Sequence, residues 1–68
     1  MTGIIKILNK EKGFGFVEVK NLNKDLFFHA TKVFGGTFEE LEQGQEVTVE
    51  GVAQNEKGQY AVGITINN

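Results

Sequence analysis

The chain has 68 residues, with seven lysines against nine acidic residues and a formal net charge of −2. A chain of this length forms one small domain, here residues 1–68, that buries about 60% of its unfolded surface. Cysteine is absent, which excludes disulfides and thiolate metal sites. No apolar run approaches the ~20 residues of a membrane-spanning helix and no signal-peptide pattern is found, so we expect a cytoplasmic protein. A mildly acidic chain gains little attraction to nucleic acid from its overall charge, so any such binding must depend on stacking and on individual lysines.

Short apolar segments separated by polar turns predict a series of strands. The first spans residues 4–8, whose four branched aliphatic side chains are too many for one face, so a twist or bulge is expected to divide them. The second strand spans residues 14–19 and the third spans residues 25–29. The polar links at residues 9–13 and 20–24 are short, which favours an antiparallel meander.

Between residues 30 and 45 the alternation of apolar and polar residues stops. Thr37 followed three residues later by Glu40 has the form of a capping box, which marks the start of a helix. Gly44 is suited to ending such an element. We therefore expect one or two helical turns inside a long loop.

Two further strands complete the predicted sheet. The fourth spans residues 45–51, with Val47 and Val49 facing inward, and the last spans residues 59–66 after a turn at residues 55–58. Five short strands without a long amphipathic helix predict an all-β fold, a small five-stranded antiparallel barrel. Such a sheet closes on itself and so removes its exposed edges.

Four ring-bearing residues are expected to share one face of this barrel. Successive side chains of a strand point to opposite faces, so Phe14 and Phe16 project together while the glycine and valines of that strand supply the other face. The same alternation pairs Phe27 with His29 on the third strand. If these two strands are neighbours, the four residues form a single surface, here named the aromatic face. Unpaired nucleobases can stack on such a surface.

Two alternative interpretations compete with a binding surface. Phenylalanines two apart on a strand are commonly half of a core, but this strand is apolar on both faces and the chain is too short to cover both. Exposed rings in a cluster usually mark a site. Residues 12–17 also nearly match a signature of the RNA-recognition motif. That fold requires two substantial helices, which this sequence lacks, so the barrel is favoured.

These motifs, in this order and at this spacing, resemble the bacterial cold-shock protein family over nearly the whole chain. Gly3, Lys6 and Asn9 fit the opening of the family, residues 12–17 match its first ribonucleoprotein motif, and residues 25–29 resemble its second. The resemblance implies a five-stranded Greek-key barrel of the OB-fold type, a cold-shock domain. It also implies binding of single-stranded RNA or DNA in the manner of an RNA chaperone.

The resemblance extends through the long loop. Phe38 lies where the family has a loop phenylalanine, and Leu41 and residues 44–45 lie where it has the pattern L-x-E-G-Q. The resemblance therefore assigns Phe38 to the binding surface. Packing of Phe38 on Leu41 is the alternative.

Several departures from the family predict reduced affinity. Ile7 and Leu8 stand where the family usually has tryptophan and phenylalanine, and Ala30 stands where it usually has another phenylalanine. A proline common near Gly58 is missing, and Gly63 replaces a common asparagine. Each stacked base contributes ~1–3 kcal/mol, and ~1.4 kcal/mol corresponds to a tenfold change in affinity. Loss of three rings thus predicts binding weaker by about a hundredfold or more, although Ile7 and Leu8 still offer apolar contact.

The predicted interface joins stacking side chains to two cations. We assign stacking to the phenylalanines, stacking or hydrogen bonding to the histidine and phosphate contacts to the lysines; the residues are Lys6, Lys12, Phe14, Phe16, Phe27, His29 and Phe38. Lys57 is a weaker candidate for a phosphate contact, and Tyr60 is either a core ring or a rim contact.

Neither catalysis nor a metal or other cofactor is predicted. The chain has no serine or cysteine nucleophile and a single histidine. Asp25, four residues before His29, is expected on the opposite strand face and so not as its partner. We expect a monomer, with strand exchange through Gly35 and Gly36 as the alternative route to a dimer. The rival function is a protein-interaction or self-associating barrel that has lost most of its nucleic-acid affinity.

Overall fold

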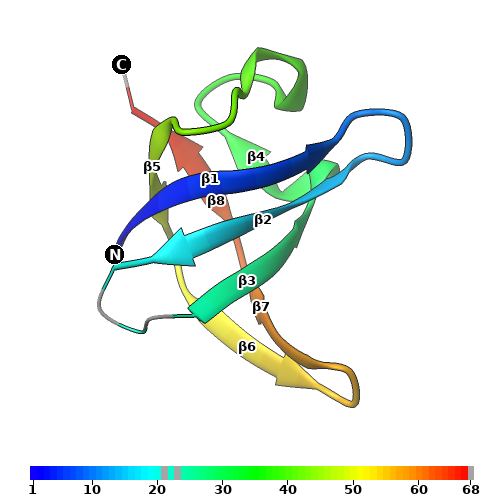
Figure 1. Cartoon of the computed structure of the whole chain (residues 1–68), viewed down its shortest axis with the longest axis vertical. Helices are drawn as coiled ribbons and strands as arrows, with labels where there is room; N and C mark the ends of the chain where they lie inside the picture. The colour runs from blue at the N-terminus through cyan, green and yellow to red at the C-terminus, as the bar shows by residue number, and fades with distance from the viewer. Residues whose placement is uncertain (21, 23, 68) are drawn as a thin grey trace.

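The computed structural model describes residues 1–20, 22 and 24–67, and in this part of the chain it contains short strands and two single 3₁₀ turns (Figure 1). The elements are β1 (Thr2–Asn9), β2 (Phe14–Val19), β3 (Lys24–His29), η1 (Ala30–Lys32), β4 (Val33–Phe34), η2 (Phe38–Glu40), β5 (Glu46–Val49), β6 (Val52–Asn55), β7 (Gly58–Ala61) and β8 (Ile64–Ile66). The predicted all-β class is confirmed. No described helix is long and apolar enough to cross a membrane.

The first three strands form the predicted antiparallel meander. The register between β1 and β2 shifts between Ile5 and Ile7, which is the irregularity expected from the aliphatic run. Because the shift adds a residue to one strand, Ile5 faces the core while Ile7 is 49% exposed. Of the predicted turn at residues 20–24, Asn21 and Asn23 lie outside the described residues.

The second half of the sheet is a single bent hairpin, and here the predicted strand bounds were wrong. The fourth strand is interrupted after β5, and β6 follows as a separate segment; the last strand is similarly divided into β7 and β8. β5 pairs with β8 and β6 pairs with β7, both antiparallel. The amide of Glu50 donates to the carbonyl of Gly63, and the amide of Val62 donates to Gly51, each at 2.9 Å. These two bonds keep the hairpin paired through its bend.

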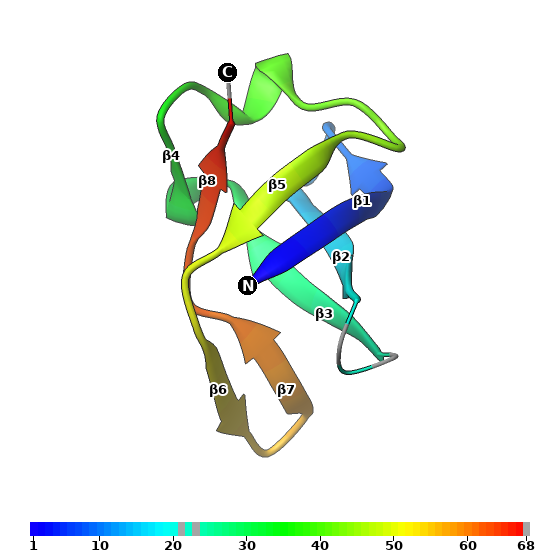
Figure 2. The ribbon, with the colours of Figure 1, turned by 90° about the vertical axis from the view of Figure 1, so that its left-hand side faces the viewer.

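The bent hairpin contacts both sides of the meander, which curls the sheet around one core (Figure 2). β5 pairs antiparallel with β1, and β7 meets β3 through the single pair Phe27 and Tyr60. The predicted barrel is thereby obtained, with one correction. The contacts between β3 and β7 and between β4 and β8 are parallel, not antiparallel. In both ribbon views the β6–β7 hairpin projects from the lower end of the molecule.

The segment between β3 and β5 contains the helical turns expected there. The Glu40 carboxylate accepts hydrogen bonds from the Thr37 backbone amide at 2.9 Å and from its hydroxyl at 3.1 Å, as the capping-box spacing predicted. Gly44 has a φ of +87°, a conformation that favours glycine. The two-residue strand β4 in this segment was not predicted.

The core lies between the inner faces of the strands. Its buried apolar residues are Ile5, Val17, Val19, Leu26, Phe28, Phe38, Leu41, Val47, Val49, Ala61, Ile64 and Ile66. The inward orientation of Val47 and Val49 was predicted. Gly15 also faces inward, where a Cβ atom would approach the Ile7 carbonyl oxygen to 2.6 Å and the Phe28 ring to 2.8 Å. The missing side chain therefore lets β2 pass close to the core while its other face stays outside.

Candidate nucleic-acid interface

The register of β2 against β3 brings the aromatic face together. Phe14 is paired with His29, and Phe16 is paired with Phe27. Residues directly opposite in an antiparallel pair point to the same side of the sheet. All four side chains therefore lie on one outer surface, while the alternate residues of both strands are buried.

The three phenylalanine rings of this face contact one another. Phe14 and Phe27 are stacked with ring centroids 5.6 Å apart, and Phe16 meets Phe14 edge-on at 6.1 Å and Phe27 at 5.9 Å. Both arrangements are favoured by aromatic quadrupoles and contribute about 0.5–1.5 kcal/mol per pair. Phe27 is 38% exposed, and Phe14 and Phe16 are half-buried. The rings thus hold each other in place while part of each remains accessible to a flat ligand.

His29 extends the face at the end of β3. Its Nδ1 accepts a hydrogen bond from the Thr31 backbone amide at 3.2 Å and lies 3.0 Å from the Thr31 hydroxyl. An Nδ1 that accepts from an amide places the ring proton of neutral histidine on Nε2. The exposed histidine is therefore held in one orientation with an Nε2–H donor available to a base or phosphate.

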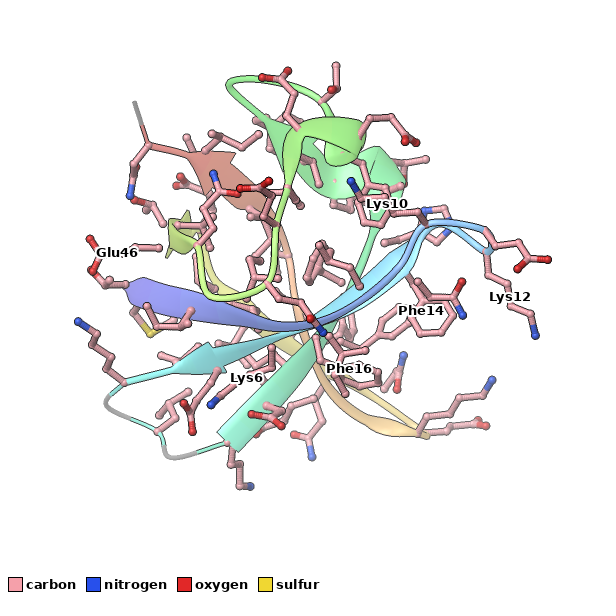
Figure 3. The ribbon with its side chains drawn as sticks, turned by 45° about the horizontal axis from the view of Figure 1, so that its top comes forward. Lys6, Lys10, Lys12, Phe14, Phe16 and Glu46 are labelled. Carbon is pink, nitrogen blue, oxygen red and sulfur yellow. The ribbon has the colours of Figure 1, made fainter. Side chains whose placement is uncertain are left out.

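Charged residues border the aromatic face at both ends. Lys12 is exposed in the β1–β2 turn beyond Phe14, whereas Lys6 lies on the other side of Phe16 (Figure 3). The Lys6 ammonium is 3.2 Å from the Glu18 carboxylate, and Glu18 is paired across the strands with Asp25. Lys6 is thus partly neutralised by an acidic neighbour.

Asp25 lies on the same strand face as His29, because residues four apart on a strand share a side. The expectation that it faces the other way was wrong. The described hydrogen bonds of the His29 ring are to Thr31. The pairing of Glu18 with Asp25 instead makes Asp25 part of the acidic border of the aromatic face.

Phe38 is not brought to this surface. Its side chain is only 6% exposed and packs edge-on against Phe28 with ring centroids 6.2 Å apart. The short capped turn η2 directs the ring into the barrel beside Leu41, which belongs to the same buried cluster. The assignment of Phe38 to base stacking therefore has no support in this geometry, and the packing alternative describes it better.

The two aliphatic residues that replace expected rings on β1 behave differently. Ile7 is paired with Phe16 and is largely exposed, so it adds apolar area beside the aromatic face. Leu8 is instead partly buried and packs on the core. Only one of the two offers the apolar contact that was expected from both.

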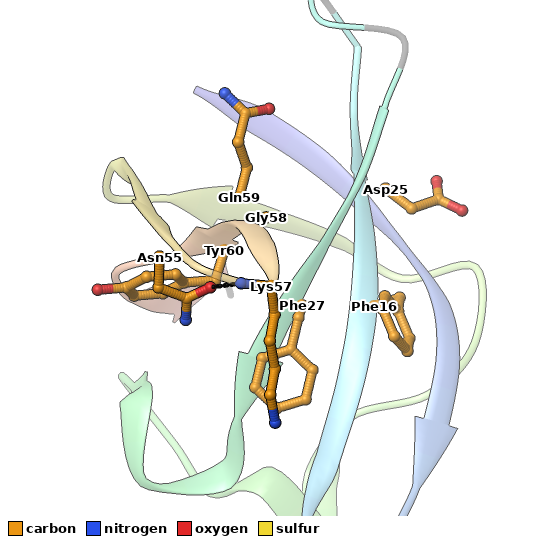
Figure 4. Close-up of a pocket in the computed structure, with 8 residues that line it drawn as sticks. All are labelled: Phe16, Asp25, Phe27, Asn55, Lys57, Gly58, Gln59 and Tyr60. Atoms are coloured by element: carbon orange, nitrogen blue, oxygen red, sulfur yellow. Dashed lines mark hydrogen bonds between the residues drawn. The ribbon is translucent and has the colours of Figure 1, made fainter.

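A hollow of about 410 Å³ adjoins the aromatic face and shares Phe16 and Phe27 with it, but the sequence assigned no central residue to its hairpin wall (Figure 4). Its walls come from β2, β3 and the β6–β7 hairpin; the lining residues are Phe16, Asp25, Phe27, Asn55, Lys57, Gly58, Gln59 and Tyr60. Tyr60 and Lys57 were weighed as rim or phosphate contacts and left out. The available signal was a lone tyrosine two residues after a polar turn, but its position beside Phe27 depends on the bend of the hairpin.

Comparison with known proteins assigns the chain to a family. The family model of the "Cold-shock" DNA-binding domain matches residues 1–67. The chain is 42% identical over 66 residues to the cold shock-like protein CspD of Bacillus cereus, covering 97% of both chains. It is also 42% identical over 62 residues to the cold shock protein CspB of Geobacillus stearothermophilus, covering 91% of both. The chain belongs to the cold-shock domain family, and its curled sheet is the OB-fold that the resemblance implied.

Replacing Glu18 with glutamine is expected to strengthen binding of a short single-stranded oligonucleotide by about threefold at low salt. The substitution removes an acidic group beside Phe16 and releases Lys6, whose exposed ion pair contributes at most about 1 kcal/mol. One additional phosphate contact would also steepen the slope of log affinity against log salt by about 0.7. Fluorescence anisotropy at several salt concentrations measures both quantities.

The matched control is Glu46→Gln. Glu46 pairs with Lys20 at 3.4 Å on the surface and lies far from Phe14 and Phe16 in Figure 3. Both substitutions change the net charge equally. Equal gains in affinity from the two variants would show that only total charge matters and that Lys6 is not held back by Glu18.

Proposed function

We propose that this chain is a single-stranded nucleic-acid-binding protein of the RNA-chaperone type, which acts in the cytoplasm and is not an enzyme. Its aromatic face receives unpaired bases, so that a bound strand is hindered from re-forming hairpins. The observation that carries the proposal is the cluster of three mutually packed phenylalanine rings on the outside of the barrel. Membership of a family described as DNA-binding supports it.

Binding depends mainly on stacking, with a small electrostatic part. Every base has a π-face, so stacking tolerates any sequence. Of the two lysines assigned to phosphate, Lys12 forms no ion pair among the described residues, and Lys6 is paired with Glu18. One or two phosphate contacts give a salt slope of about −0.7 to −1.4 for a single strand. A shallow slope is therefore expected.

The affinity is low for a member of this family. Three positions that the family fills with rings hold Ile7, Leu8 and Ala30, and the burial of Phe38 withdraws a further ring from the surface. At ~1–3 kcal/mol per stacked base, these differences amount to a hundredfold or more in the dissociation constant, at about tenfold per 1.4 kcal/mol. The protein is thus a transient partner of unpaired strands, which suits rapid release.

The test is a titration of labelled oligo(dT) and oligo(U) by anisotropy, with the variant Phe27→Ala. Phe27 contacts both other rings of the cluster and is the most exposed of the three. Its loss is expected to weaken binding by about five- to a hundredfold. Wild-type protein should bind in the micromolar range at low salt.

The control is Phe34→Ala. Phe34 is an exposed ring on β4, 51% accessible, and it belongs to no ring contact in the described part of the structure. Its removal is expected to leave affinity unchanged. The proposal fails if wild-type protein shows no binding at high-micromolar concentration in low salt, or if both variants bind as well as wild type.

A further inference from the structure

Phe34, on β4, is the most exposed large apolar side chain in the described part of the chain, at 51%. The preceding residue, Val33, packs on the core, so the alternation of β4 directs the Phe34 ring outward. Figure 2 shows β4 and β8 at the left of the barrel, whereas β2 and β3, which carry the aromatic face, lie at its right. The Phe34 ring is therefore a feature separate from the aromatic face.

The Phe34 ring lies directly over the backbone of Gly63. A Cβ atom at position 63 would approach the ring to 3.0 Å, so a side chain there would displace it. Glycine at this position, where the family commonly has asparagine, thus makes room for the ring. An aromatic side chain that covers a glycine shields its backbone, and Gly63 is indeed buried. This packing accounts for one side of the ring and leaves its other side open.

A carboxylate is held beside the same ring. The Cβ atom of Glu50 lies 3.5 Å from the position that a Cβ atom of Gly63 would occupy, so Glu50 and the Phe34 ring flank Gly63 together. The Thr65 hydroxyl donates a hydrogen bond to the Glu50 carboxylate, and Thr65 is paired with Phe34 between β8 and β4. Glu50 is exposed. An exposed ring and an oriented carboxylate therefore lie next to each other.

The charge of the surrounding elements favours a cationic partner. Residues 33–56, which include β4, β5 and the segment between them, carry six acidic residues and no lysine. Residues 1–32 carry six of the seven lysines and three acidic residues, and Lys32 in η1 is the nearest lysine to Phe34 along the chain. A second copy placed symmetrically on Phe34 would bring two acidic segments together, which is unfavourable. A basic partner instead meets complementary charge.

The size of the patch favours a short segment over a whole domain. A stable protein–protein interface takes about 800 Å² from each partner, which is about a fifth of the 4349 Å² surface of this chain. Beside Phe34, the exposed large apolar residue at this bend is Val62, next to Gly63. Two exposed side chains cannot supply such an area, but they can hold one or two side chains of a peptide.

Arginine is the cationic side chain that fits the pair of Phe34 and Glu50. Its planar guanidinium stacks on aromatic faces and donates two parallel hydrogen bonds to a carboxylate, whereas lysine acts as a point charge. We propose that Phe34 and Glu50 form a docking site for an arginine-containing basic segment of a partner protein. The ring receives the guanidinium, the Glu50 carboxylate accepts its hydrogen bonds, and Thr65 holds Glu50 in position. No residue of the aromatic face takes part, so the inference is independent of the proposed binding of single strands.

The probe is a capped pentapeptide in which glycine and arginine alternate, compared with the same peptide carrying lysine or citrulline instead of arginine. Titration at low salt is followed by the amide resonances of the ¹⁵N-labelled protein. The arginine peptide is expected to shift the resonances of Phe34, Glu50 and Gly63 and to bind about threefold or more tighter than the lysine peptide, while the citrulline peptide leaves them unchanged. Shifts spread over all acidic residues, or equal affinity for arginine and lysine, would indicate unspecific charge attraction and overturn the site.

Variants of the two central residues provide the second test. Phe34→Ala and Glu50→Gln are each expected to weaken the arginine peptide by about threefold or more, and Phe34→Ala also removes the preference for arginine over lysine. Glu46→Gln, which removes the same charge from a strand of the same sheet, is the matched control and is expected to bind as wild type. Phe34→Tyr keeps the ring and retains binding. Thermal unfolding shows whether each variant is folded at the temperature of the titration.

Three results would overturn the proposal. Folded Phe34→Ala, or folded Phe34→Tyr and Glu50→Gln compared with each other, may not differ from wild type in the way stated; equal peptide affinity of Glu50→Gln, Phe34→Ala and wild type shows that the site is absent. Concentration-dependent association of wild-type protein that Phe34→Ala abolishes would assign the surface to a second copy. Shifts of the Phe34 resonance on addition of oligo(dT) would assign it to nucleic acid. Failure of oligo(dT) to bind would remove the proposed function and leave this site standing.

Discussion

Phe28→Ala is expected to lower the free energy of unfolding by about 3–5 kcal/mol, roughly a third or more of the total. Phe28 is 0% exposed, packs against Phe38 and fills the space that Gly15 leaves open. Truncating a buried phenylalanine to alanine costs about 3–5 kcal/mol. At roughly 0.05–0.15 kcal/mol per residue, a domain of this length has a total stability of about 3–10 kcal/mol. The substitution therefore removes a large part of the total free energy of unfolding. Urea unfolding followed by far-ultraviolet circular dichroism measures this loss.

The adjacent residue supplies the matched control. Phe27→Ala removes the same side chain from the same strand, but on the outer face, where it is partly solvated. It is expected to lower the free energy of unfolding by about 1–3 kcal/mol, the scale of its two ring contacts. Phe28→Leu, which retains most of the volume, should fall between the two alanine variants. Equal unfolding midpoints for Phe27→Ala and Phe28→Ala would contradict the assignment of β3 faces.

The parts of the fold that the sequence predicted well are those in which strand alternation alone decides the structure. β2 has the predicted bounds, and β3 differs by one residue. Their neighbouring positions followed from a short link, and the shared face of Phe16 and Phe27 then followed from alternation. The aromatic face needed only these local facts, together with the argument that a short chain cannot cover both faces of β2.

The parts that were missed depend on contacts between segments distant in sequence. Phe38 lies at the position of the family's loop phenylalanine. Only its contact with Phe28, ten residues earlier, shows that its side chain enters the core. Division of the last two strands reflects a bend in a hairpin that must meet both β1 and β3. The same bend places Tyr60 beside Phe27. No local pattern in residues 59–66 contains that information.

The ion pair between Lys6 and Glu18 was also not predicted from the sequence. Lys6 and Glu18 are twelve residues apart in sequence and meet because β1 and β2 are neighbours and both side chains lie on the outer face. Without the register shift in β1, counting from Ile5 would place Ile7 inside the barrel. The irregularity therefore determines the exposure of an aliphatic side chain next to Phe16, whereas strand pairing determines the partial neutralisation of a predicted phosphate contact.

The double variant Phe14→Ala/Phe16→Ala is expected to lose detectable nucleic-acid binding while remaining folded. Both rings project from the outer face of β2, whereas its inner residues are unchanged, so the core is intact. Two rings at ~1–3 kcal/mol each reduce affinity by about 30-fold to more than a thousandfold. Starting from micromolar affinity, such a loss puts binding beyond the range of an anisotropy titration.

Loss of binding by this variant is informative only if the barrel persists. The double variant removes all three ring contacts, worth about 1.5–4.5 kcal/mol together. At ~4–8 °C per kcal/mol in a domain of this size, the melting temperature is expected to fall by about 6 °C or more. The titration is therefore made well below the transition, with Phe34→Ala as the control for removal of an exposed ring. A folded double variant that binds oligo(dT) as tightly as wild type would show that bases do not stack on this face. The rings would then need another explanation, because these three partly exposed phenylalanines lie outside the buried core cluster.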